Sequence, residues 1–224
     1  MRNPQETLQH VREQLQWDSR IDASHITVEL DDGSLVLKGT VPTFSMADAA
    51  ETAAWTAAPD AENIVNKIKA KHLPAENAVS DDQIQKTIEN ILRWNPRIDP
   101  SFLEIECAKG QVTLKGTIDS YWQKQRAEEL IGEVSGVVQI TNNLSVQPKS
   151  RVEDKLIYED ILAAFRRDRR LNSSRIIVTV EDAKVALTGA VPDRDRMRIA
   201  KNIAVYTRGV KEVENNLRVE HPKA

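Results

Sequence analysis

The sequence has few of the residues on which catalysis, metal binding and disulfide formation depend. Its 224 residues include one cysteine, which excludes an internal disulfide and a cysteine-rich metal cluster. The four histidines share no repeat position and no metal-ligand spacing. No run approaches the roughly 18 apolar residues of a membrane-spanning helix, and no apolar segment of the secretory kind follows Arg2. We therefore expect a cytoplasmic protein, or a periplasmic one if the N-terminus is a processed form.

Other signatures of chemistry are also missing. There is no glycine-rich phosphate-binding loop, and the acidic pairs fall at expected turns and helix starts, where carboxylates have structural uses. Hydrophobic residues make up 40% of the chain and charged residues 29%, which is typical of a soluble globular protein. The sequence therefore predicts no catalytic residue, no cofactor and no metal site.

One short unit occurs three times along the chain. Its clearest marker is a glycine in an alternating apolar segment, found at Gly39, Gly116 and Gly189 with spacings of 77 and 73 residues. Because the chain has only eight glycines, we interpret these three as structural: positive φ would let the second strand turn into the second helix. The matching segments are residues 35–42, 112–119 and 185–192.

Each copy has the pattern helix, strand, strand, helix, strand. Apolar residues recur at helical spacing in residues 84–92 of the second copy, and the two segments that follow alternate as half-buried strands do. The sequence therefore predicts an α+β fold of three tandem small αββαβ modules, each a three-stranded mixed sheet covered by two helices. The expected modules comprise residues 1–73, 78–147 and 152–220.

This unit resembles the BON domain (bacterial OsmY and nodulation), a small αββαβ module. The resemblance rests on a strand with the pattern apolar-x-Leu-x-Gly-x-Val and on a later Gly-Val pair followed by Asn-x-Leu-x-Val. Its best fits are Gly116-Thr117-Ile118 with Gly136-Val137, and residues 189–191 with 209–219. The first copy departs from the pattern, since residues 59–60 are Pro-Asp and one residue is inserted.

The resemblance carries expectations about function. It implies a non-catalytic module that binds phospholipid membranes or other envelope surfaces, in proteins induced by osmotic stress. It supplies no catalytic or ligand-contacting residues that could be carried over to this chain.

Charge is distributed unevenly along the chain. From Arg151 onward there are 16 basic and 12 acidic residues, a net charge of +4, whereas the preceding part carries −7. Basic side chains close to an anionic membrane each contribute up to about 1 kcal/mol of attraction. An ordinary solvated face, with cations favourably placed at a helix C-terminus, explains the same pattern. The candidate contacts for an anionic surface are Arg166, Arg167, Arg169, Arg170, Arg175, Arg194, Arg196 and Arg198.

Two functional hypotheses follow. The first is association with an anionic phospholipid surface through the third copy. The alternative is a protein-interaction or self-assembly scaffold that uses spare sheet surface. Trp17 and Trp94 end the first helices of two copies. They are interpreted either as side chains that cap the small core or pack between units, or as exposed anchors for a membrane interface or a protein partner. Nucleic acid is a weaker candidate partner, because the basic region lacks interleaved aromatics for base stacking. Catalysis is the least favoured of the possibilities.

Overall fold

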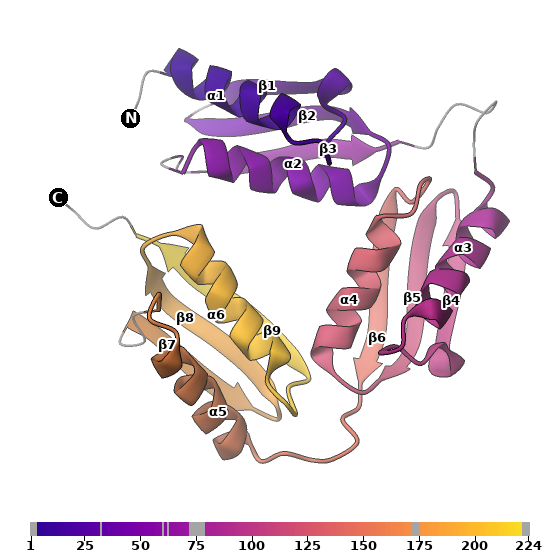
Figure 1. Ribbon diagram of the computed structural model, residues 1–224, viewed down its shortest axis with the longest axis vertical. Helices are drawn as coiled ribbons and strands as arrows, with labels where there is room; N and C mark the ends of the chain where they lie inside the picture. Colours follow the sequence, from indigo (N-terminus) through magenta and orange to yellow (C-terminus); the bar gives the residue numbers. More distant parts are fainter. Residues whose placement is uncertain are drawn as a thin grey trace. The chain divides into compact units, whose positions relative to one another are not determined.

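A computed structural model of the chain contains three small modules, each with its own sheet (Figure 1). Every sheet has three strands and is accompanied by two long helices, in the chain order helix, strand, strand, helix, strand. The predicted α+β fold of tandem αββαβ modules is confirmed. None of the helices in the described residues has the length and hydrophobicity that a membrane span requires. The structure describes residues 4–31, 33–59, 61, 63–71, 79–171 and 175–220.

Module 1 comprises α1 (Pro4–Trp17), β1 (Ile26–Asp31), β2 (Ser34–Val41), α2 (Phe44–Ala57) and β3 (Ile64–Ala70). Strand β2 lies in the middle of the sheet, antiparallel to β1 and parallel to β3. The parallel pair requires a crossover connection, which α2 supplies. Alanine dominates the buried face of α2, so the core of this module is built from small side chains on that side.

Module 2 comprises α3 (Asp81–Trp94), β4 (Leu103–Ala108), β5 (Gln111–Ile118), α4 (Tyr121–Gly132) and β6 (Gln139–Val146). Its strand order is β4-β5-β6, so the second strand again lies in the middle of the sheet, as in module 1. Helix α3 begins with a capping box: the Ser80 hydroxyl accepts from the Gln83 amide, and the Gln83 side chain accepts from the Ser80 amide. Reciprocal capping satisfies donors that a helix start leaves unpaired.

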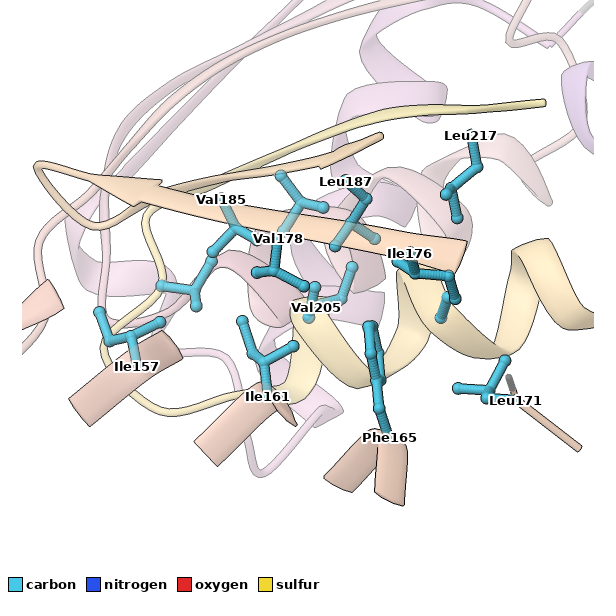
Figure 2. Close-up of a cluster of buried hydrophobic side chains, with 14 of the residues drawn as sticks. Ile157, Ile161, Phe165, Leu171, Ile176, Val178, Val185, Leu187, Val205 and Leu217 are labelled. Carbon is cyan, nitrogen blue, oxygen red and sulfur yellow. The ribbon is translucent and has the colours of Figure 1, made fainter. Parts of the chain in front are cut away.

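Module 3 comprises α5 (Asp154–Arg167), β7 (Ile176–Glu181), β8 (Lys184–Val191), α6 (Arg194–Tyr206) and β9 (Glu212–Val219). Strand β8 pairs antiparallel with β7 and parallel with β9. Both helices cover one face of this sheet, and Figure 2 shows their apolar side chains meeting those of the strands. The side chains from α5 recur at i, i+4 and i+8, which places them on one face of that helix. They are Ile157, Ile161 and Phe165, all fully buried.

The repeated glycine marks a close approach of two backbone segments. Gly39 lies within β2 opposite Ile26 with φ 133°, and a Cβ there would overlap the carbonyl oxygen of His25. Gly189 has φ 112°, and a Cβ there would overlap the carbonyl oxygen of Arg175; Gly116 shares the backbone angle, with φ 120°. The turn into the second helix, which the sequence suggested as the reason for these glycines, is therefore not what requires them. The segment that leads into the first strand leaves no room for a side chain.

An acidic residue joins the first helix to the hairpin in two modules. The Asp81 carboxylate accepts the amides of Lys109 (2.7 Å) and Gly110 (2.9 Å) in module 2. Asp154 accepts the amides of Asp182 (2.8 Å) and Ala183 (2.9 Å) in module 3. Both carboxylates are at the first position of their helix, and module 1 has Pro4 at that position. Module 1 therefore cannot make this connection.

Candidate anion-binding site in module 3

Four of the candidate arginines cluster where α5 ends. Arg166 and Arg167 occupy its last turn, while Arg169 and Arg170 follow in the next loop, and all four side chains are exposed. The carbonyl groups that end a helix carry partial negative charge, so cations are stabilised there. The cluster is therefore compatible with the fold and remains open to solvent.

The start of α6 brings further arginines to the same end of the module. The Arg196 Nε donates to the Arg170 carbonyl oxygen at 2.6 Å, which places the beginning of α6 beside the end of α5. Arg194 and Arg198 are also in the first turns of α6, and both are exposed. Arg175 directly precedes β7 and is exposed as well.

Short-range carboxylates neutralise part of this charge. Arg170 makes a two-pronged ion pair with Asp168, at 2.9 and 2.6 Å. Arg196 pairs with Asp193, and Arg198 pairs with Asp195 at 3.0 Å. By contrast, Arg166, Arg167, Arg169 and Arg175 form no ion pair with any residue that the structure describes. Most of the unpaired positive charge therefore lies at the end of α5.

An open groove of about 520 Å³ runs between α5 and α6. Arg167 and Arg170 line it from the α5 side, and Arg208 lines it from the loop after α6. The Arg208 Nη2 donates to the Ser150 Oγ at 3.0 Å. Sequence analysis did not identify Arg208, because it is 38 residues beyond Arg170 and belongs to no basic run. Asp160 and Asp168 also line the groove, so its polarity is mixed.

The Arg170–Asp168 pair gives a prediction about pH. Hydrogen bonds from the Arg170 guanidinium, and then from its backbone amide, lower the pKa of Asp168 to about 2. A carboxyl group whose pKa is lowered by folding contributes stability that is present above its unfolded pKa of about 3.9 and is lost as the pH falls through about 2. We expect an NMR titration of the Asp168 carboxyl to have its midpoint near 2 in the native chain. The midpoint should move toward about 3.9 in Arg170→Ala. A native midpoint already near 3.9 would contradict the pairing.

Aromatic side chains replace the basic ones at the corresponding positions of modules 1 and 2. Trp17 ends α1 and is 79% exposed; Trp94 ends α3 and is 84% exposed. Arg167 occupies this position in module 3. Exposed tryptophan is common where a protein meets a membrane interface or a partner protein. The core-capping role considered for these tryptophans does not fit such exposure.

The single cysteine is not poised for chemistry. The Cys107 Sγ donates to an Asp81 carboxylate oxygen at 3.4 Å. Burial and the neighbouring carboxylate raise the pKa of its thiol to about 11, which disfavours the nucleophilic thiolate. Among the residues described, no group of three or more His, Cys, Asp and Glu side chains is arranged to hold a metal ion.

Comparison with known proteins identifies the class. The family model of the BON domain matches residues 5–71, 80–148 and 153–221, which is nearly the whole chain in three copies. The chain belongs to the BON domain family. A curated relative, the osmotically-inducible protein Y of Escherichia coli (strain K12), is 24% identical over 165 residues, covering 71% of this chain and 82% of that protein. A second, an uncharacterized protein of Anaplasma centrale, is 24% identical over 128 residues, covering 55% of this chain and 85% of that protein.

Solved structures give weaker similarities. CdsD, described as a structural protein of the type III secretion system of Chlamydia trachomatis, matches with 13% identity and a TM-score of 0.28. The match covers 96% of this chain and 93% of that one. At this identity and TM-score it carries no conclusion about function.

Proposed function

We propose that this chain is a non-catalytic binding protein that associates with anionic phospholipid surfaces through module 3. The observation that carries the proposal is the group of exposed arginines without ion pairs at the end of α5, namely Arg166, Arg167 and Arg169. Arg208 lies at the other end of the groove between α5 and α6, beside Ser150, which precedes α5. We call Arg166, Arg167 and Arg169 the basic end of module 3.

The expected attraction is modest for each residue and considerable for the group. A basic side chain near an anionic leaflet contributes about 1 kcal/mol, and the effect fades within a Debye length of the surface. Arginines already paired with a neighbouring aspartate contribute less, because the pair has little net charge. The unpaired residues of the basic end therefore account for most of the expected binding.

The relative in Escherichia coli supports a setting for this activity. Its name identifies it as an osmotically inducible protein, and we propose that the present chain likewise acts during osmotic or envelope stress. The compartment is a separate matter: the cytoplasmic location expected from the sequence, and the periplasmic one for a processed form, stay predictions.

Vesicle co-sedimentation tests the proposal. The full chain should pellet with vesicles of mixed phosphatidylglycerol and phosphatidylcholine, and only weakly with phosphatidylcholine alone. Arg166→Glu/Arg167→Glu should weaken binding to the anionic vesicles at least tenfold, because two attractive charges become repulsive. Added salt should weaken native binding in the same assay.

A matched control separates this surface from net charge. Lys86 and Arg93 are exposed residues of α3, and Lys86→Glu/Arg93→Glu changes the net charge by the same amount. We expect this control to bind the anionic vesicles as the native chain does. Equal pelleting of the native chain with both kinds of vesicle would contradict lipid recognition. Equal loss in both double variants would contradict the assignment to module 3.

The second candidate function is a protein-interaction or self-assembly scaffold. The exposure of Trp17 and Trp94 is the observation in its favour, because large aromatic side chains are enriched in the centres of protein interfaces. Size-exclusion chromatography with light scattering discriminates the two candidates. A chain that stays monomeric at high concentration, captures no protein and still binds anionic vesicles would leave only the first.

A further inference from the structure

Module 1 contains a small apolar cavity at the end where α1 begins. Its volume is about 70 Å³. Thr7 and His10 of α1 provide the polar groups in its lining, and Gly33 contributes backbone at the hairpin. The lining is otherwise mostly apolar and includes Pro4, Leu30, Leu35, Ala57, Ala58 and Pro59.

Two core positions explain why the space is there. Thr7 is the fourth residue of α1, and the fourth residues of α3 and α5 are Ile84 and Ile157, both fully buried. In module 3 the end of the Ile157 side chain comes within 3.4 Å of the place where a Cβ on Gly209 would stand, so this isoleucine fills the space between helix and loop.

The second position is on the second helix. Ala57 is the fourteenth residue counted from the start of α2, and Val134 is the fourteenth from the start of α4. Val134 is 7% exposed and belongs to the core of module 2. Replacing an isoleucine and a valine by threonine and alanine removes several buried carbon atoms, and cores relax only partly around such deletions.

The contact between the start of the first helix and the hairpin also differs between module 1 and module 3. In module 3 the Asp154 carboxylate bridges the helix start to the hairpin amides of Asp182 and Ala183. Pro4 occupies that helix position in module 1 and lines the cavity. In module 1 the apolar proline ring, which lines the cavity, thus stands where module 3 has the carboxylate of the bridge.

We propose that this cavity is a binding site for the end of a short alkyl chain. The apolar lining favours an apolar occupant, since a water molecule needs two to four polar partners. The volume is about half of the roughly 150 Å³ of an apolar cavity that holds benzene, which favours a chain end of a few carbons over a ring. Thr7 and His10, the polar residues of the lining, offer a hydroxyl and an imidazole as contacts for the polar part of the ligand. This proposal concerns module 1 and does not depend on lipid binding by module 3.

Methyl NMR of the full chain tests the site with hexan-1-ol as the probe. We expect saturable shifts of the Leu30, Leu35 and Ala57 methyl groups. Thr7→Ile and Ala57→Val restore the larger side chains of module 2, and each should weaken binding at least tenfold. Ala57→Val is followed through the two leucines. The control Thr56→Val lies on the exposed face of α2 and should bind as the native chain does.

The outcomes are decisive in both directions. Absence of saturable shifts in the native chain, or unchanged affinity in both filled variants, would overturn the proposal. Two independent variants keep the test valid if one of them fails to fold. A second arm uses dihexanoyl phosphatidylcholine below its micelle concentration. Shifts with both probes identify an esterified lipid chain as an occupant, and shifts with hexan-1-ol alone identify a free alkyl compound.

Discussion

Gly39→Ala is expected to lower the free energy of unfolding of module 1 by about 3 kcal/mol or more, because two costs add. The native φ of 133° is a conformation that L-residues rarely adopt. The new Cβ would also overlap the carbonyl oxygen of His25, so the ladder between β1 and β2 would have to shift. Hydrogen exchange of the full chain measures the effect as lost protection of the β2 amides.

A glycine of the same module provides the control. Gly33 also has positive φ, at 79°, but a Cβ there would meet no atom within 4 Å. Gly33→Ala should therefore cost only the backbone strain of about 1–2 kcal/mol. Equal losses of protection in the two variants would show that the backbone angle alone matters and that the close approach at Gly39 does not.

Phe165→Ala should destabilise module 3 by about 3–5 kcal/mol, which is the usual cost of removing a buried phenyl ring. Phe165 is fully buried, and its ring extends from α5 into the centre of the cluster in Figure 2. Protection of the β8 amides against hydrogen exchange should fall accordingly, since β8 is the central strand of that sheet.

Phe165→Leu is the matched variant for this position. The corresponding residues of the other modules are Leu15 and Leu92, which are both buried, so the shared fold accommodates a leucine at this position. We expect a cost of about 1–2 kcal/mol, because the branched side chain fills most of the space. A leucine variant as unstable as the alanine variant would mean that module 3 requires the aromatic ring itself.

Most of the fold could be predicted from the sequence because its signals repeat. The helical spacing of Ile84, Ile88 and Leu92 predicted the buried face of α3, and the alternation around Gly116 predicted β5. Three aligned copies removed the ambiguity that short apolar segments usually carry. The function of the repeated glycine was misjudged, because a close approach between segments more than ten residues apart leaves no local trace.

Less of the candidate site could be predicted, for two reasons. The sequence shows how many arginines are near the end of α5, yet their available charge depends on whether Asp168, Asp193 and Asp195 turn toward them. Arg208 joins the groove only through the packing of α6 against α5. Helix faces follow from periodicity, whereas ion pairs and grooves depend on side-chain direction and tertiary packing.

The acidic bridge between the first helix and the hairpin is not the same in all three modules. Two copies keep the aspartate, and the copy with Pro4 still folds into the same sheet. The bridge is thus dispensable for the shared fold, and the copy without it has an apolar cavity at that end of the module. A repeated module can therefore lack one stabilising contact and keep its fold, and comparing the copies with one another shows where such a contact is absent.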